Sequence, residues 1–383
     1  MVPELPVTLF SDHNPSRYQG GEELVLRNTL LGLAARGWRC LLAYHEWGDL
    51  VPEYEAAGIA CRQFDLTPAR VNHPLTFLGS VTGQALWARS QGVRLLHCNS
   101  YFRAAHAAAI RSLGGFPAIC HLHNPPPDYL SRQYRWGLQR LDGFIAVSDQ
   151  TAAEWSRALH IPRAHWSVLH NGIDLNRFRP DSHARQSARS EIDAAPSTAI
   201  IGYCGRLIRD KGIDVLLRAV AKLTGLDVRV VVLGSDAQNV RLYGARLEPE
   251  LKELAAQLGL ADRTIFLGAR HDVERWYNAF DILAVPSVYS DPLPLAVVEG
   301  LACGVAVVAS RIGGIPELLG GPLGELLVPS RDEVALAATL RRLIDDPKRR
   351  VELGSLGRSV AEREFGMSRF LDGIEAIMCE QMQ

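Results

Sequence analysis

The sequence predicts an α/β protein made of two Rossmann-like halves, and three observations support this fold class. Short apolar runs alternate with amphipathic stretches, which is the pattern of a parallel sheet whose strands are joined by helices. These runs fall into two comparable series, one on each side of a polar segment. A chain of 383 residues is also long enough for two domains that each bury a core.

The predicted strands are the short apolar runs of each series. In the first half they are residues 7–10, 40–44, 59–64, 95–98, 118–123, 144–148 and 167–170. In the second half they are residues 199–203, 228–233, 264–267, 282–285, 305–309 and 325–328. The first strand is followed by a predicted helix from Glu22 to Arg36, because its leucines recur with helical spacing.

The predicted domain boundaries follow the change in composition along the chain. Residues 1–175 form the N-terminal domain and residues 199–362 the C-terminal domain. Residues 176–198 are polar and poor in large apolar side chains, which predicts a linker with a short helix. Residues 363–383 are expected to form a C-terminal helix that packs on the first domain. Its apolar positions recur at i, i+4 and i+7: Phe370, Ile374 and Ile377.

Composition excludes several classes of function. A formal net charge of −1 argues against a general nucleic-acid binder. No run approaches the roughly 18 apolar residues that a membrane span requires. The seven cysteines are scattered without a C-x-x-C pair, and the first strand leaves no room for a signal peptide. We therefore expect a cytoplasmic protein, with a place at the inner face of the membrane as an open alternative.

The stretch from Pro286 to Gly304 has the sequence pattern of a ligand site at a sheet edge. A buried strand precedes it and another follows it, so the stretch joins two strands through a loop and a helix. The loop holds Asp291 and the helix Glu299. Pro292 or Pro294 suits the first turn of that helix, where free N–H groups favour an anion. An ordinary crossover with solvated acids remains the alternative.

Two cations follow the first strand of the second half. Arg206 comes directly after Gly205, and Lys211 precedes Gly212 at the start of a predicted helix. An arginine can give two parallel hydrogen bonds to phosphate oxygens, and a lysine supplies a point charge. The pair therefore suits a diphosphate. Arg270 ends another strand at the same predicted edge.

In the first half, glycines and histidines stand at strand ends. Gly20 and Gly21 precede a helix start, where backbone N–H groups favour a phosphate, although a tight turn explains them equally well. His121 and His123 share one face of a strand, and a metal site there lacks a third ligand of clear spacing. Residues 128–140 mix arginines with aromatics, which favours a solvated helix over contact with a membrane surface or an acceptor.

These residues together resemble the retaining glycosyltransferases of family 4, which have the GT-B architecture of two Rossmann-like domains facing a central cleft. The matching motifs occur in the family's order along nearly the whole chain. They are Gly20-Gly21, His121-Leu-His123-Asn124, Val147-Ser148, Asn171-Gly-Ile-Asp174 with Phe178 and Pro180, Gly205-Arg206-Leu, Lys211-Gly212, Val232-Leu-Gly234, Phe266-Leu-Gly268, Pro286-Ser287, and the acid pair Asp291 and Glu299.

The resemblance implies catalytic roles for four residues. Arg206 and Lys211 would hold the donor's diphosphate and stabilise the charge on the leaving group. Asp291 and His123 would contact the transferred sugar. The further donor contacts that it implies are Gly20, Gly21, Gly205, Arg270, Leu293, Leu295 and Glu299, the last with the ribose hydroxyls. The family usually has glutamate at 291 and glycine at 294, so Asp291 and Pro294 make the sugar preference less transferable.

The resemblance further implies transfer of a hexosyl unit from a nucleotide-diphosphate sugar to an acceptor hydroxyl, in glycan, glycolipid or natural-product glycoside synthesis. A UDP-sugar is favoured and a GDP-sugar is an alternative. No cofactor or metal is expected. The acceptor, a small molecule, a glycan or a lipid-linked group, would meet loops of the first domain: Tyr18, His45–Asp49, Val71–Thr76 and Tyr101–His106. A nucleotide-sugar 2-epimerase, a sugar phosphorylase and a non-catalytic partner subunit stay open.

Overall fold

The computed structural model describes residues 6–17, 20–65, 74–236 and 246–383. The chain divides into two compact units, which are treated separately below. The first unit comprises residues 1–171 and 368–383, and the second comprises residues 172–367. Tyr18 and residues 71–73, which the sequence places in acceptor loops, lie outside the described residues.

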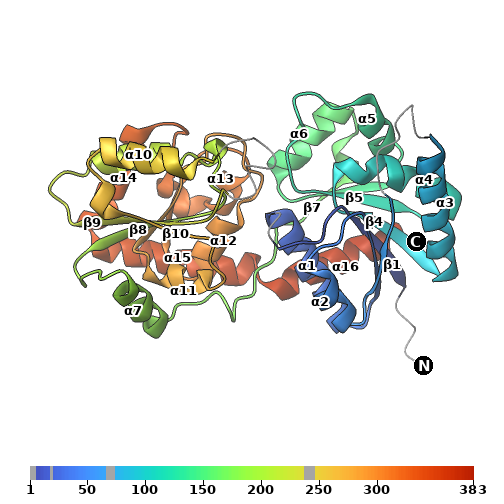
Figure 1. Ribbon diagram of the computed structural model, residues 1–383, viewed down its shortest axis with the longest axis horizontal. Coiled ribbons are helices and arrows are strands. Elements are labelled where there is room, and N and C mark those ends of the chain that lie inside the picture. The colour runs from blue at the N-terminus through green and yellow to red at the C-terminus, as the bar shows by residue number, and fades with distance from the viewer. Residues whose placement is uncertain (1–5, 18–19, 66–73, 237–245) are drawn as a thin grey trace. The chain divides into compact units, whose positions relative to one another are not determined.

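The first unit is built on a seven-stranded parallel sheet with the strand order β3-β2-β1-β4-β5-β6-β7 (Figure 1). Every strand predicted for this half of the chain overlaps an observed one. The strands are β1 (Val7–Asp12), β2 (Arg39–Tyr44), β3 (Ala60–Gln63), β4 (Val93–Cys98), β5 (Ala118–Leu122), β6 (Gly143–Ala146) and β7 (Trp166–Val168).

Helices cover both faces of this sheet and close its core. They are α1 (Gly21–Ala35), α2 (Val51–Ala56), α3 (Pro74–Ser90), α4 (Ala104–Gly114), α5 (Arg132–Leu138), α6 (Asp149–Leu159) and α16 (Met367–Gln381). The predicted stripe of α1 is confirmed, since Leu26, Leu30 and Leu33 are fully buried. The helix α4 packs between α3 and α5 over a core that includes Trp155.

The C-terminal helix α16 packs on the first unit. Nη1 of Arg36 forms an ion pair with Oδ1 of Asp372 at 2.8 Å, and the Trp38 ring N–H donates to Glu375 at 2.8 Å. The buried stripe of α16 continues from Phe370 and Ile374 to Met378 rather than to Ile377, which is only half-buried. A spacing of four residues keeps the stripe on one side of the helix.

The second unit contains a six-stranded parallel sheet with the strand order β10-β9-β8-β11-β12-β13. Each strand predicted for this half again overlaps an observed one. The strands are β8 (Ala199–Cys204), β9 (Val228–Leu233), β10 (Thr264–Gly268), β11 (Ile282–Val285), β12 (Ala306–Ser310) and β13 (Leu327–Val328).

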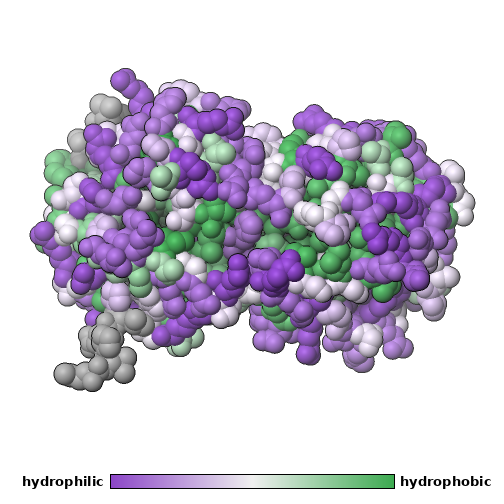
Figure 2. All heavy atoms as spheres, turned by 180° about the vertical axis from the view of Figure 1, so that it is seen from behind, coloured by the Kyte–Doolittle hydropathy of each residue, from purple (hydrophilic) through white to green (hydrophobic). Residues whose placement is uncertain are grey.

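The helices of the second unit also lie on both faces of its sheet. They are α7 (Ser182–Glu191), α8 (Ile213–Ala221), α10 (Glu248–Gln257), α11 (Val273–Ala279), α12 (Leu295–Ala302), α13 (Ile315–Leu318), α14 (Glu333–Asp345) and α15 (Pro347–Glu364). The helices α12 and α15 pack together, as do α8 and α14. Figure 2 shows hydrophilic residues over much of the outer surface on one side of the molecule.

The polar segment 176–198 lies within the second unit and contains α7, the short helix predicted there. The helix α7 packs against α11. Arg189 and Arg185 form ion pairs with the buried carboxylate of Asp281 at 3.0 and 2.7 Å. This segment is therefore fixed to the second sheet by ion pairs, although it has few apolar residues.

Both sheets reverse their strand order at one point. The reversal lies between β1 and β4 in the first unit and between β8 and β11 in the second. In open parallel sheets, ligands bind beyond the carboxyl ends of the strands at such a switch point. The fold therefore singles out the loops after β1, β4, β8 and β11.

Candidate functional site

The switch point of the second unit brings Lys211 and Asp291 together. The loop after β8 carries Lys211, and the loop after β11 carries Asp291. Nζ of Lys211 donates to Oδ2 of Asp291 at 2.5 Å, and the Ser287 hydroxyl donates to the same oxygen at 3.0 Å. Asp291 is 8% exposed, so this carboxylate is buried and holds the ammonium group in place.

These two loops touch along their backbones at Gly212. This residue has φ +66°, and a Cβ atom on it would lie 2.0 Å from the Pro286 carbonyl oxygen. The Val288 N–H donates to the Asp210 carbonyl at 2.8 Å across the same contact. A side chain at position 212 would force the loops apart, so the glycine is needed for the Lys211–Asp291 contact.

A second glycine fixes Asp291 from the other side. Gly313 has φ +59°, and a Cβ atom there would lie 2.2 Å from the Asp291 carbonyl oxygen. The N–H of Gly314 donates to that oxygen at 2.9 Å. The position of Asp291 is therefore determined by backbone contacts as well as by its side chain.

Arg206 stands at the carboxyl end of β8 with its side chain exposed. Its carbonyl accepts a hydrogen bond from the Tyr203 hydroxyl at 2.8 Å, which holds the backbone of the loop. Within the part of the chain that the structure describes, no carboxylate forms an ion pair with the Arg206 guanidinium. The guanidinium can therefore turn toward an anion without breaking an existing pair.

Glu299 projects from α12, which begins at Leu295 with Pro294 as its N-cap, so Pro294 rather than Pro292 stands at the helix start. The Tyr277 hydroxyl donates to Oε2 of Glu299 at 2.6 Å. Burial raises the pKa of Glu299, and the Tyr277 hydrogen bond opposes this by favouring the ionised form. Leu293, just before the helix, is buried at 5% exposure.

Sequence reasoning did not find Tyr277 and Ser287 as partners of the two acids. Tyr277 lies on α11, 22 residues before Glu299, and no local pattern links the two. Ser287 stands four residues before Asp291 in the loop after β11. Its place in the Pro286-Ser287 motif was the available signal, but a loop serine is more often a turn residue.

Arg270 stands at the end of β10 but has other partners. Its guanidinium pairs with Asp272 at 2.9 Å and Glu191 at 3.5 Å, and it lies over the Trp276 ring. A donor contact from Arg270 stays a prediction. A donor that contacts Arg270 would compete with the carboxylates of Asp272 and Glu191 for its guanidinium.

In the first unit, the predicted residues also stand at strand ends and a helix start. Gly20 is the N-cap of α1, and Gly21 is its first residue. Nε2 of His123 lies 3.2 Å from Oδ1 of Asn99, and the His123 ring packs on His121. Burial lowers the pKa of His123 to about 3, so the ring is neutral at pH 7 and interacts through hydrogen bonds rather than charge.

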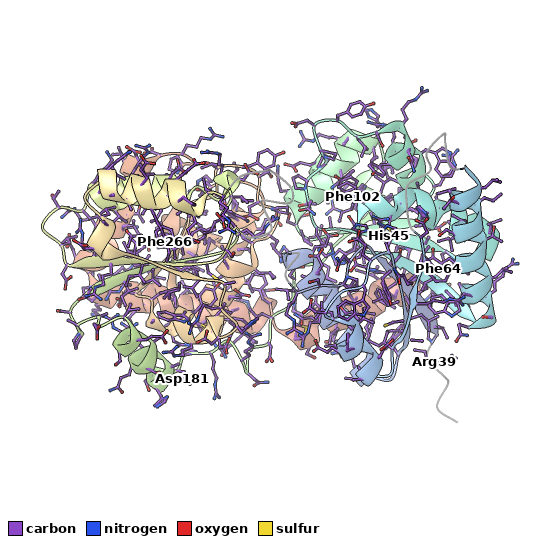
Figure 3. All side chains as sticks on the ribbon, viewed as in Figure 1. Arg39, His45, Phe64, Phe102, Asp181 and Phe266 are labelled. Atoms are coloured by element: carbon purple, nitrogen blue, oxygen red, sulfur yellow. The ribbon has the colours of Figure 1, made fainter. Side chains whose placement is uncertain are left out.

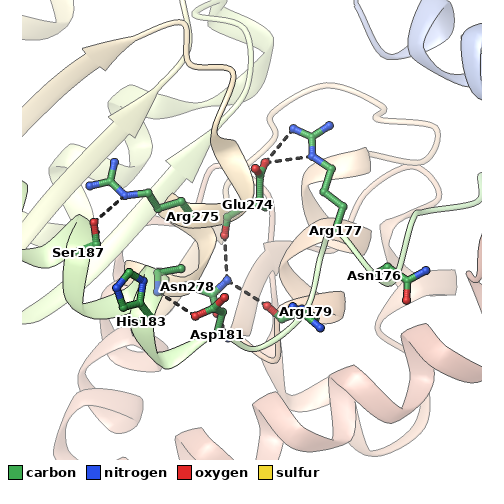
Figure 4. Close-up of a pocket in the computed structure, with 10 residues that line it drawn as sticks. Asn176, Arg177, Arg179, Asp181, His183, Ser187, Glu274, Arg275 and Asn278 are labelled. Atoms are coloured by element: carbon green, nitrogen blue, oxygen red, sulfur yellow. Dashed lines mark hydrogen bonds and ion pairs between the residues drawn. The ribbon is translucent and has the colours of Figure 1, made fainter.

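The second unit also has an open polar pocket of about 400 Å³ beside α7 and α11 (Figure 4). Its walls include Arg177, Arg275 and Glu274. Arg177 pairs with Glu274 at 2.8 Å. None of the residues predicted to bind the donor lines this pocket.

The described residues hold no group of three or more His, Cys, Asp or Glu side chains arranged to bind a metal ion. Nor does any helix among them combine the length and apolar character needed to cross a bilayer.

The fold matches solved structures along almost the whole chain. An Anabaena protein, HepE, in complex with UDP has 21% sequence identity and a TM-score of 0.85, and the match covers 98% of this chain and 100% of that one. Sucrose-phosphate synthase from Thermosynechococcus elongatus has 23% identity and a TM-score of 0.81, covering 98% of both chains. Two parallel-sheet Rossmann-like units of this kind define the GT-B fold class.

Family comparisons identify the chain more closely. The model described as Glycosyltransferase Family 4 matches residues 19–177, and the model described as Glycosyl transferases group 1 matches residues 198–346. The chain belongs to glycosyltransferase family 4. A D-inositol 3-phosphate glycosyltransferase of Mycobacterium ulcerans is 33% identical over 268 residues, covering 69% of this chain and 54% of the relative. A D-inositol 3-phosphate glycosyltransferase of Saccharomonospora viridis is 36% identical over 219 residues, covering 55% of this chain and 49% of the relative. The chain thus spans about half the length of these relatives.

Proposed function

We propose that the chain transfers a hexosyl unit from a nucleotide-diphosphate sugar to an acceptor hydroxyl, with retention of the anomeric configuration. The observation that carries this proposal is the grouping of Lys211, Arg206 and Glu299 at the switch point of the second sheet. Cations at that point suit a diphosphate, and a carboxylate on the neighbouring helix suits ribose hydroxyls. Retention is an expectation that rests on the resemblance to the family.

The arrangement suits departure of a diphosphate. Breaking the anomeric bond leaves negative charge on the diphosphate and positive character on the sugar ring. Lys211 is held by Asp291 before the donor arrives, so its charge needs no reorganisation when the bond breaks. Arg206 can add two parallel donors from the start of the same loop. In this scheme Asp291 positions Lys211, and its predicted contact with the transferred sugar remains part of the proposal.

A UDP-sugar is the favoured donor. The structural neighbour HepE binds UDP, and another structure of it holds UDP-glucose, which supports a uridine nucleotide here. A GDP-sugar is the alternative. The names of the curated relatives contain an inositol phosphate, which supports a hydroxyl-bearing small molecule as the acceptor class.

The proposal is tested by a thermal-shift panel of UDP-, GDP-, ADP- and TDP-sugars on the full chain in the presence of EDTA. A ligand that binds only the folded protein raises its stability in proportion to ln(1 + [L]/Kd). We expect one base to raise the melting temperature without added metal, because Arg206 and Lys211 supply the positive charge. Absence of any shift in EDTA, with a shift restored by magnesium or manganese, would contradict metal-independent binding.

A further inference from the structure

The polar pocket beside α7 and α11 lies within the second unit and is separate from the residues predicted to bind the donor. Its volume of about 400 Å³ is in the range of pockets that bind small molecules. The segment before α7, α7 itself and α11 form its walls (Figure 4). Asp181, which Figure 3 labels in the second unit, is the N-cap of α7. The proposed transfer reaction gives this pocket no role.

Hydrogen bonds of the Asn278 side chain fix the walls of the pocket. Its Oδ1 accepts from the Asp181 N–H at 2.7 Å. Its Nδ2 donates to the carbonyl oxygens of Arg179 at 3.0 Å and Glu274 at 2.9 Å. The backbone that carries Arg179 is therefore joined to α11 without a ligand. Walls that are already ordered lower the cost of binding.

Three guanidinium groups line the pocket, and they differ in their partners. Arg177 pairs with Glu274 at 2.8 Å, and Arg275 pairs with Glu191 at 2.6 Å. Within the described part of the chain, no carboxylate forms an ion pair with the exposed Arg179. Arg179 can therefore bind an anion without giving up a partner. A guanidinium matches the geometry of phosphate oxygens, so phosphate is the anion that suits this position.

Uncharged polar groups stand beside these guanidinium groups. The side chains of Asn176 and Ser187 are exposed and line the pocket. The Ser187 hydroxyl accepts from Nε of Arg275 at 3.3 Å and keeps its own proton to donate. An amide and a hydroxyl suit the hydroxyl groups of a ligand, and inorganic phosphate would leave them unused. The walls therefore suit a small phosphorylated polyol.

The pocket is linked electrostatically to Glu299. Glu274 and Tyr277 lie three residues apart on α11, so they are neighbours on the helix surface. Burial has the largest influence on the pKa of Glu299 and raises it, and the Tyr277 hydrogen bond lowers it. The charge of Arg177 also lowers this pKa, and that of Glu274 raises it. A negative charge bound at Arg177 would therefore disfavour the ionised form of Glu299.

We propose that this pocket binds a small phosphorylated polyol as an effector that weakens nucleotide binding. Arg179 and Arg177 hold the phosphate, and Asn176 and Ser187 contact the hydroxyl groups. The bound phosphate offsets the charge of Arg177, so the Glu299 carboxylate becomes a poorer acceptor for the ribose. This coupling rests on the proposed function of Glu299, whereas the binding of the effector does not. Bound nucleotide weakens effector binding by the same factor.

The first test is calorimetric titration of the full chain with glucose 6-phosphate, glucose and inorganic phosphate. Glucose 6-phosphate should bind, and each of the other two probes should bind at least about tenfold more weakly. Arg179→Ala should weaken glucose 6-phosphate binding by at least about tenfold, because it removes a charged hydrogen-bond donor. Arg218→Ala, which removes an exposed guanidinium from α8, should leave it unchanged, as should Lys211→Ala. Unchanged binding in Arg179→Ala, or equal binding of inorganic phosphate, would overturn the proposal.

The second test is titration of UDP and GDP at increasing concentrations of glucose 6-phosphate. The apparent Kd of the nucleotide should rise by about fivefold or more and then reach a plateau, because the two ligands occupy separate sites. Arg179→Ala should abolish this rise. A rise without a plateau would place glucose 6-phosphate at Arg206 and Lys211 and overturn the proposal. Failure of both nucleotides to bind would contradict the transferase function, while the dependence of glucose 6-phosphate binding on Arg179 would still decide whether the pocket is a site.

Discussion

The switch points of the two sheets lie at the same place in the strand order and differ in their charged side chains. In the second unit, an ammonium group and an exposed guanidinium stand at the strand ends, and the buried carboxylate of Asp291 is paired with Lys211. In the first unit, Asp12 and Glu22 stand at the corresponding edge with raised pKa values, among neutral histidines. Strand order determines where a site lies, but the side chains at the strand ends determine the charge of that site.

The largest expected effect comes from removing either of the two cations at the second switch point. Lys211→Ala and Arg206→Ala should each lower kcat by about 10²–10³, because each removes a preorganised charge that acts on the leaving diphosphate. The measurement is turnover at saturating donor and acceptor. Lys222→Ala is the matched control, since Lys222 follows α8 and pairs with Glu333 at 3.1 Å.

A double variant separates catalysis from folding at the same site. Lys211→Ala leaves the buried Asp291 carboxylate without its ammonium partner and should destabilise the protein. Adding Asp291→Asn removes that unpaired charge and should restore the melting temperature while kcat stays low. Recovery of both quantities together would show that Lys211 has only a structural role.

The sequence predicts the sheets well but the local chemistry less completely. Apolar runs predict the strands, and the sequence places Lys211 and Asp291 in loops that follow two strands of the second sheet. The segment 176–198 shows the limit of this method, because α7 is fixed by ion pairs to Asp281 rather than by an apolar stripe. Tyr277 was missed because its role depends on a partner that the chain brings close only after folding.

The next effect concerns nucleotide affinity at the second switch point. Glu299→Ala should weaken binding of both the free nucleotide and the nucleotide sugar by about 1.5–3 kcal/mol, the worth of a hydrogen bond to a charged group. Calorimetric titration measures both affinities. Tyr277→Phe is a milder variant for comparison, because it keeps the Glu299 carboxylate and removes only the hydrogen bond that orients it. Unchanged nucleotide affinity in Glu299→Ala would remove Glu299 from the ribose site.

The smallest effect is a gain in stability at the first switch point. The folded-state pKa of Asp12 is about 6 against an ordinary 3.8, so folding favours its neutral form. That contribution to stability is fully present below about pH 4 and is lost as the pH rises through 6. Asp12→Asn should therefore raise the unfolding free energy by about 1–3 kcal/mol at pH 8 and by little at pH 4.

Chemical denaturation at several pH values measures this difference between variant and wild type. The buried His97, whose pKa burial lowers to about 4, destabilises the protein as the pH falls below 6.5. It does so in both proteins, so it cancels in the comparison. A loss of stability at pH 8 in Asp12→Asn would mean that the ionised carboxylate is well compensated in the folded chain.

The most direct test of the cationic second switch point is calorimetric titration of UDP and UMP in EDTA, with GDP and GMP in parallel. The wild type should bind the diphosphate of one base more tightly than its monophosphate, because Arg206 and Lys211 meet the second phosphate. In Arg206→Ala and Lys211→Ala this preference should fall by about tenfold or more, while Lys222→Ala keeps it. Equal preference for the diphosphate in all four proteins would contradict the assignment of the diphosphate to these two cations.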